Sequence, residues 1–266
     1  MKKSSLVGIW ILASAVAVGV RADSKLKFQA QPGSTARAQQ TAAPADPKKT
    51  GVSPSNPTGA TAQNPEAMDE VLHSMDENAS KFHTAQADFV WQIYNSVIND
   101  IAETDKGKIY FRRSGPNLQM SARFTDPPSK QVVFTGKAVQ ILQPGGQVDE
   151  YDTAAHQGEL ETFLVLGFGS SGKDLQKSFE LQDLGEESID GVLTHKLQLT
   201  PKAEDVRRHV PKIVLWMQPN GLSKQQQIYL EGGDYRTAKY ASIQLNQNLS
   251  DNLFKLKGNL KKTVKH

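Results

Sequence analysis

The chain has 266 residues, 38% of them hydrophobic, and no cysteine. Without cysteine there are no disulfides and no thiolate metal sites, so stability has to come from an apolar core. The formal net charge is +3, but basic residues gather near both ends and leave the body between residues 64 and 254 acidic. An acidic body argues against nucleic-acid binding, because a basic face supplies most of that affinity.

The first residues predict an export signal. Two lysines precede an uncharged run from Leu6 to Val20, and the small residue Ala22 follows. This run is shorter than the roughly 20 apolar residues that a membrane-spanning helix needs. We expect a signal peptide over residues 1–22 with cleavage after Ala22. An uncleaved amino-terminal membrane tether is the alternative.

The composition divides the rest of the chain into three parts. Residues 23–63 are rich in Ala, Gln, Thr, Pro, Gly and Ser, which predicts a disordered linker. About 200 residues follow, enough for one core, and we expect one domain over residues 64–257. Residues 258–266 form a basic tail. The tail could contact anionic lipid headgroups or an acidic partner, or be a frayed, soluble terminus.

The domain is predicted to begin with a helix. Asn64 suits an N-cap, Pro65 suits the first helical position, and Glu66 favours the positive end of the helix dipole. An apolar stripe at helical spacing follows: Met68, Val71, Leu72, Met75, Ala79 and Phe82. The stripe suits ordinary core packing and also suits a helix that covers a ligand cavity.

From Ala85 onward the apolar residues recur with a period of two, which predicts strands. Short turn signals separate the strands, and short connections join antiparallel neighbours. After the first strand we expect strands over 106–113, 117–124, 130–135, 138–143, 147–152, 178–184, 191–199, 211–218, 222–230 and 235–246.

A second amphipathic helix is predicted between residues 155 and 168, where Leu160, Phe163 and Leu164 have helical spacing. Two helices with about eleven antiparallel strands predict an α+β fold, in which a curved sheet covers the helices and encloses a possible cavity.

The glycine-rich stretch from Gly167 to Lys173 resembles nucleotide-binding loops but lacks their context. A phosphate loop needs Ser or Thr after the lysine, and here Asp174 follows. A dinucleotide loop needs a βαβ unit, whereas antiparallel strands surround this stretch. We therefore expect a flexible hinge after the second helix.

The sequence shows no catalytic or metal-binding pattern. No two of the six histidines have the i, i+4 spacing of a zinc protease, and no strand-flanked Gly-x-Ser-x-Gly elbow is present. We expect no catalytic residue, no metal and no cofactor. A hydrolase on this fold would require a polar cavity with a serine or carboxylate beside a histidine.

Arg113 shares a face of its strand with Ile109 and Phe111. If that face points inward, Arg113 lies at the mouth of the cavity and has to be paired there, for instance with backbone carbonyls of a covering helix. The alternative is an arginine at a strand end that reaches solvent.

Several segments, in this order and spacing, resemble the periplasmic lipoprotein-carrier family, LolA. They span roughly residues 66–257. They are Lys81-Phe82-His83-Thr84-Ala85-Gln86-Ala87-Asp88-Phe89, Gly107-Lys108-Ile109-Tyr110-Phe111-Arg112-Arg113, Gly136-Lys137, Thr162-Phe163-Leu164, Leu199-Thr200-Pro201-Lys202, Pro219-Asn220-Gly221 and Asn252-Leu253-Phe254.

The resemblance implies a half-open, strongly curved antiparallel barrel whose helices form a lid over an apolar cavity for acyl chains. It implies no catalysis and no cofactor. The family's lid-holding arginine falls on Arg113, with Arg112 as the alternative. The cavity and lid residues expected on this basis are Phe89, Trp91, Ile93, Ile109, Phe111, Leu160, Phe163, Leu164, Phe168 and Leu215.

The function implied is that of a monomeric periplasmic carrier that shuttles acylated lipoproteins from inner to outer membrane. Its partners would be an inner-membrane release complex and an outer-membrane acceptor. The alternative is a carrier or sensor of another lipid, such as a glycolipid or a polyisoprenoid, on the same fold.

Overall fold

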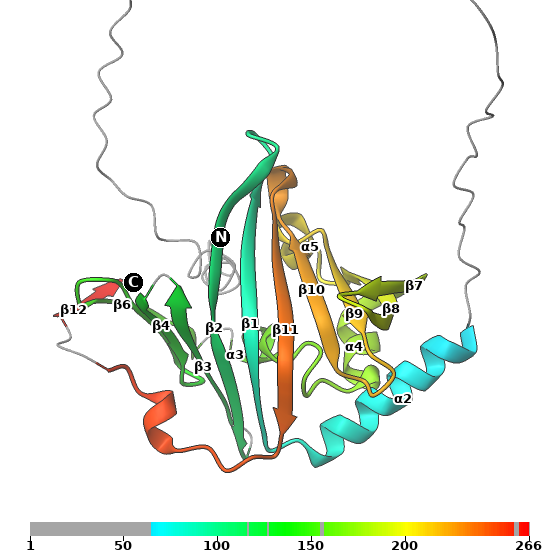
Figure 1. Ribbon diagram of the computed structural model, residues 1–266, viewed down its shortest axis with the longest axis horizontal. Helices are drawn as coiled ribbons and strands as arrows, with labels where there is room; N and C mark the ends of the chain where they lie inside the picture. Colours follow the sequence, from blue (N-terminus) through cyan, green and yellow to red (C-terminus); the bar gives the residue numbers. More distant parts are fainter. Residues whose placement is uncertain (1–64, 116, 127, 155–156, 258–260, 266) are drawn as a thin grey trace, which may run out of the picture. The chain divides into compact units, whose positions relative to one another are not determined.

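The computed structural model describes residues 65–115, 117–126, 128–154, 157–257 and 261–265 (Figure 1). The predicted signal peptide over 1–22 and the predicted linker over 23–63 lie outside the described residues. No helix in the described ranges has both the length and the apolar character needed to cross a membrane.

An open antiparallel sheet of eleven strands, extended by a twelfth, dominates the described part (Figure 1). The spatial order is β12-β6-β5-β4-β3-β2-β1-β11-β10-β9-β8-β7, so β1, β2 and β11 are central. The strands are β1 (Thr84–Asn95), β2 (Asp100–Ser114), β3 (Asn117–Asp126), β4 (Pro128–Phe134), β5 (Ala138–Leu142), β6 (Gln147–Asp152), β7 (Phe179–Ile189), β8 (Val192–Pro201), β9 (Lys212–Met217), β10 (Ser223–Tyr229), β11 (Tyr235–Leu245) and β12 (Lys261–Lys265).

The eleven antiparallel strands confirm the sequence prediction, and short turns explain their order. Asp190 and Gly191 join β7 to β8 with φ angles of 50° and 80°, which suit a tight hairpin turn. The twelfth strand was not predicted. Residues 261–265 of the tail pair in parallel with β6, where the edge of the sheet offers unpaired backbone groups.

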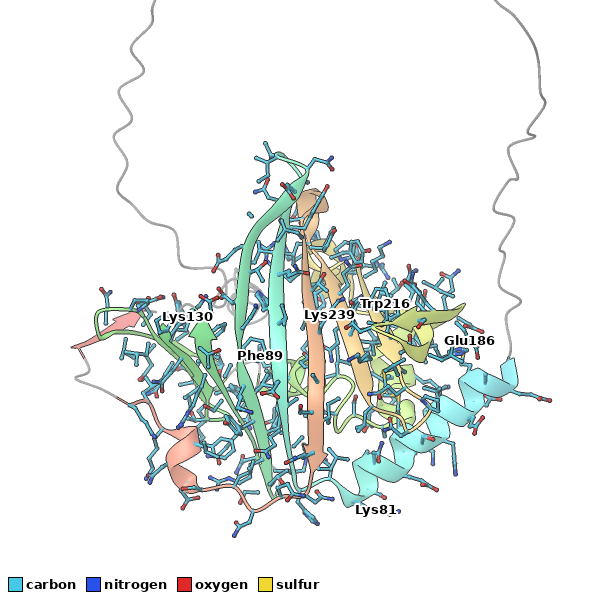
Figure 2. The ribbon with its side chains drawn as sticks, viewed as in Figure 1. Lys81, Phe89, Lys130, Glu186, Trp216 and Lys239 are labelled. Atoms are coloured by element: carbon cyan, nitrogen blue, oxygen red, sulfur yellow. The ribbon has the colours of Figure 1, made fainter. Side chains whose placement is uncertain are left out.

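The helices are α2 (Pro65–Lys81), α3 (Gln157–Leu164), α4 (Gly172–Ser178) and α5 (Glu204–His209), with short 3-10 turns η2 (Glu231–Gly233) and η3 (Asp251–Phe254). In Figure 2, Lys81 ends α2 below the sheet and Phe89 lies on the central strand β1. α3 and α4 lie on the inner side of the curved sheet (Figure 1).

Two apolar clusters form the core. One joins β1–β5 and β11 to α3, and includes Phe89, Phe134 and Leu160. The other joins α2, α4 and α5 to β7–β9, and includes Met75 and Leu215. The apolar stripe of α2 therefore serves core packing in the second cluster, and α3 is the helix that faces the first cluster.

The second helix is shorter than predicted, and the predicted flexible hinge is wrong. α3 ends at Leu164, and residues 165–170 form a buried turn before α4. Glycines let neighbouring groups approach this turn closely. A Cβ atom at Gly167 would lie 2.2 Å from Cβ of Ser223, and one at Gly169 would lie 2.8 Å from the Phe82 ring.

We predict that Gly167→Ala destabilises the protein by roughly 2–4 kcal/mol, because it adds an overpacked methyl group to the strain of a positive φ. Gly191→Ala is the matched control. Gly191 has a similar φ of +80°, against +77° at Gly167, but has open space where the Cβ would lie. The control variant should therefore lose only about 1–2 kcal/mol of its free energy of unfolding, because it carries the backbone strain alone. Chemical denaturation measures the free energy of unfolding of both variants. An equal loss in the two variants would contradict the tight packing of this turn.

Candidate functional site

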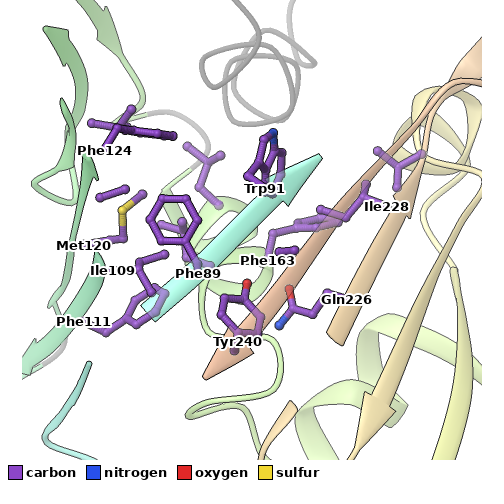
Figure 3. Close-up of a pocket in the computed structure, with 16 residues that line it drawn as sticks. Phe89, Trp91, Ile109, Phe111, Met120, Phe124, Phe163, Gln226, Ile228 and Tyr240 are labelled. Carbon is purple, nitrogen blue, oxygen red and sulfur yellow. The ribbon is translucent and has the colours of Figure 1, made fainter. Parts of the chain in front are cut away.

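An apolar cavity of about 110 Å³ lies on the inner face of the central strands, beneath α3 (Figure 3). β1, β2, β3, β4, β10 and β11 supply its walls, and α3 and Val210 after α5 complete them. The described lining contains no charged side chain, no serine and no histidine. Such a lining suits a hydrocarbon ligand.

Small side chains opposite large ones create the hollow. Ala238 on β11 pairs with Trp91 on β1 and with Gln226 on β10. Ala122 on β3 pairs in the same way with Ile109 on β2 and with Val132 on β4. Because each alanine lies between two larger neighbours, the inner surface is recessed at these two positions.

α3 covers the cavity. Leu160, Phe163 and Leu164 line the cavity from above. Near the start of the helix, the Glu161 carboxylate accepts a hydrogen bond from Gln157 Nε2 at 2.7 Å and one from the Leu118 backbone N–H at 3.4 Å. The first bond lies within α3, and the second attaches α3 to β3.

The turn after α3 is attached to β10. The backbone N–H of Ser223 donates to the Gly167 carbonyl at 2.8 Å, and Gln226 Nε2 donates to the Leu166 carbonyl. Three hydrogen bonds therefore attach α3 and the turn after it to the sheet, and none of these three involves a basic side chain.

A second hollow of about 300 Å³ lies on the other side of α3. Residues of α3, α4, β7, β8 and the turn before α5 line it, with Lys177 and Lys202 among them. Phe163 lines both hollows, and its ring is 5.9 Å from that of Phe179 in an edge-to-face contact. α3 thus separates the cavity from this outer groove.

Three polar groups belong to the lining: the Gln226 amide, the Tyr240 hydroxyl and the Trp91 indole nitrogen. The indole nitrogen has no hydrogen-bond partner among the described residues. Burial raises the pKa of Tyr240 far above its usual range, so its hydroxyl stays protonated. Among the described residues, no group of three His, Asp or Glu side chains is placed to hold a metal ion.

The structure brings seven of the predicted cavity residues together in the lining: Phe89, Trp91, Ile109, Phe111, Leu160, Phe163 and Leu164. The other three lie outside it. Ile93 is buried and pairs with Arg236 on β11, Phe168 packs behind the wall against Phe111 and Tyr240, and Leu215 belongs to the second apolar cluster. Phe168 was misplaced because α3 ends before it.

Sequence reasoning missed nine lining residues: Met120, Ala122, Phe124, Val132, Val210, Gln226, Ile228, Ala238 and Tyr240. Seven of them lie on β3, β10 and β11, at alternate positions that face the inner side of the sheet. The alternation of side chains along a strand could have indicated these seven. The contribution of Val210 depends on the fold that brings α5 to this cavity.

The family model for the outer membrane lipoprotein carrier protein LolA matches residues 80–257, which include every element around the cavity. The chain belongs to the LolA family. The predicted resemblance is thereby confirmed. A comparison with curated protein sequences finds no match.

Solved structures similar to this LolA family member share little sequence with it. A putative outer membrane lipoprotein-sorting protein domain from Vibrio parahaemolyticus is 12% identical; 71% of this chain matches 94% of that one with a TM-score of 0.38. LprF from Mycobacterium bovis is 15% identical, with 75% and 99% covered and a TM-score of 0.42. The MucA/MucB complex of Pseudomonas aeruginosa is 14% identical, with a TM-score of 0.42; 74% of this chain spans 62% of that one.

The arginine selected by the resemblance to LolA, Arg113, lies at the end of β2 on the inner face. Its backbone N–H donates to the His83 carbonyl at 2.8 Å, and its guanidinium carbon is 5.3 Å from the centre of the Phe82 ring, just after α2. A hydrogen bond from Ser171 and the charge of Lys177 lower the pKa of Asp174 on α4, and Arg113 adds to this effect.

Arg113 therefore contacts the segment after α2 and faces α4. Its guanidinium donates no hydrogen bond to another described residue. The residues that attach α3 to the sheet are others, so the lid-holding role of Arg113 stays a prediction.

Arg112, the alternative, lies on the outer face and holds the carboxyl-terminal segment. Its guanidinium donates to Gln119 Oε1 at 2.7 and 3.0 Å and to the Asp251 carboxylate, and it lies 4.4 Å from the centre of the Phe254 ring. The hydrogen bond and charge of Arg112 lower the pKa of Asp251. Arg123 supports the same segment by donating to the Asn252 carbonyl at 2.6 Å.

We predict that Arg112→Ala loosens η3 while Arg113→Ala does not, because only Arg112 contacts Asp251 and Phe254. Hydrogen exchange of the Leu253 amide, which bonds to the Ser250 carbonyl at 2.9 Å, measures the difference. Faster exchange in both variants would show that the two arginines do not act on separate faces.

Proposed function

We propose that this protein carries lipoproteins through the periplasm, from the inner to the outer membrane, with their acyl chains inside the apolar cavity. The observation that carries the proposal is the uncharged, largely hydrocarbon lining beneath the short helix α3. Membership of the LolA family supports it. Lipoproteins, an inner-membrane release complex and an outer-membrane acceptor would be the partners of a monomeric carrier.

Exposing the acyl chains of a lipoprotein to water has a large free-energy cost. Each methylene group withdrawn from water contributes about 0.8 kcal/mol, so a lipoprotein anchor leaves a membrane only if another apolar surface receives it. A cavity walled by aromatic and aliphatic side chains from six strands and one helix supplies that surface.

The cavity has to enlarge when cargo enters. Its volume of about 110 Å³ is below the roughly 300–1,000 Å³ of pockets that enclose small-molecule ligands. The outer groove gives α3 space to move into, and Phe163, which lines both hollows, lies on the path. Because α3 is attached by a few hydrogen bonds, each worth about 1 kcal/mol net, opening and release stay reversible.

We predict that Ala238→Phe abolishes cargo binding, because the added ring fills the recess between Trp91 and Gln226. Ala241→Phe, on the exposed outer face of the same strand, is the matched control and should bind normally. Native mass spectrometry of the full chain with a triacylated lipopeptide measures one-to-one complexes, and the unacylated peptide shows whether binding needs the acyl chains.

Melting temperatures confirm that both variants fold. Retained binding by Ala238→Phe would contradict the cavity as the acyl-chain site. If wild type binds no lipopeptide and a glycolipid or polyisoprenoid co-purifies instead, the cargo is another lipid.

We also predict that Arg113→Leu changes the rate at which bound lipopeptide is released to an acceptor membrane. The change removes the cation from the Phe82 ring and from the side of Asp174, and so loosens α2 and α4 on β2. Arg112→Leu, on the outer face, should leave the release rate unchanged. Stopped-flow transfer of a fluorescent lipopeptide measures the rates, and an unchanged rate in Arg113→Leu would remove Arg113 from the mechanism.

A further inference from the structure

Two of the three polar side chains in the cavity wall, Gln226 and Tyr240, stand next to each other. Gln226 pairs with Ala238, and Tyr240 follows two residues later on the same inner face of β11. Such diagonal neighbours on adjacent strands have Cα atoms about 7–8 Å apart, within reach of one small ligand group. Both residues are 7% exposed, and both line the cavity.

The orientation of the Gln226 amide follows from its one hydrogen bond. The Leu166 carbonyl can only accept, so the atom that approaches it is the NH₂ group, and Oε1 is the other end. No described residue donates a hydrogen bond to Oε1. Gln226 therefore presents a hydrogen-bond acceptor in the lining.

The Tyr240 hydroxyl supplies the complementary donor. Its ring is fixed by an edge-to-face contact with Phe168, with the ring centres 4.7 Å apart, and its hydroxyl makes no hydrogen bond with another described residue. Because burial raises its pKa, the hydroxyl keeps its proton. Figure 3 shows the Tyr240 hydroxyl and the Gln226 oxygen directed to the same side of the cavity.

Buried polar groups in native proteins nearly always have partners, so a donor and an acceptor left open side by side point to a ligand. We propose that Tyr240 and Gln226 form a subsite for an amide-linked acyl chain. The Tyr240 O–H donates to the amide carbonyl, and Gln226 Oε1 accepts from the amide N–H. This inference rests on the proposed function, because it concerns the linkage of the acyl chain that the cavity carries.

The subsite makes the carrier sensitive to how a chain is attached. An amide uses both groups, an ester can use only Tyr240, and an ether lacks the carbonyl that Tyr240 needs. Each unmade hydrogen bond leaves a buried polar group unpaired, so we expect roughly three- to tenfold weaker binding at each step from amide to ester to ether.

Three probes of matched shape test this: palmitoyl ethanolamide, the ester of palmitic acid with ethylene glycol, and the hexadecyl ether of ethylene glycol. Their affinities for the full chain are measured by competition with a fluorescent fatty acid. Tyr240→Phe keeps the ring contact with Phe168 and should remove the ester–ether difference while preserving the amide–ester difference. Gln226→Met should remove the amide–ester difference and preserve the ester–ether difference. A looser lid in this variant would change all three affinities together and leave these differences readable.

Tyr229→Phe is the matched control, because the Tyr229 hydroxyl donates to Gln227 Oε1 at 2.7 Å and Tyr229 does not line the cavity. It should keep the full order of the probes. Equal binding of the three probes to wild type would overturn the subsite while leaving acyl-chain carriage intact. If no probe binds, and the lipopeptide does not bind either, the proposed function fails and the subsite with it.

Discussion

The structure depends on one constraint: the inner face of an open, curved sheet is apolar and has to be covered. Over β7–β9, α2, α4 and α5 cover it with a closely packed cluster in which Leu175, Leu197 and Leu199 are fully buried. Over the central strands α3 is the main cover, and it spans only residues 157–164. A short helix over a wide sheet surface leaves the cavity, and the two alanines in the wall deepen it.

The same arrangement leaves open space on both sides of α3. The cavity lies on one side and the outer groove on the other, and the opening that we propose would move α3 into the groove. The turn that follows it is packed tightly against Phe82 and Ser223, which gives α3 a fixed point of attachment. A short helix between two hollows, attached through a closely packed turn, fits the reversible opening that we propose.

The outer and inner faces of the sheet carry different polar groups, which fit the different functions that we propose for them. On the outer face, Arg112 and Arg123 attach the carboxyl-terminal segment through hydrogen bonds and, at Arg112, a charge pair. Inside, the lining excludes charge and keeps three neutral polar groups, on Gln226, Tyr240 and Trp91. Neutral hydrogen-bonding groups can orient a ligand without the large desolvation penalty of a buried ion.

The sequence by itself determined the eleven antiparallel strands, the α+β class, the family and most aromatic residues of the cavity, because strand alternation and short turns are local properties of the chain. It did not determine where α3 ends, that residues 165–170 pack as a buried turn, or that residues 261–265 join β6. Those features depend on partners distant in the sequence, such as Ser223 against Gly167. Only the tertiary structure placed Arg112 and Arg113 against different partners and set Gln226 beside Tyr240, because β10 and β11 bring that pair to the cavity from far along the chain.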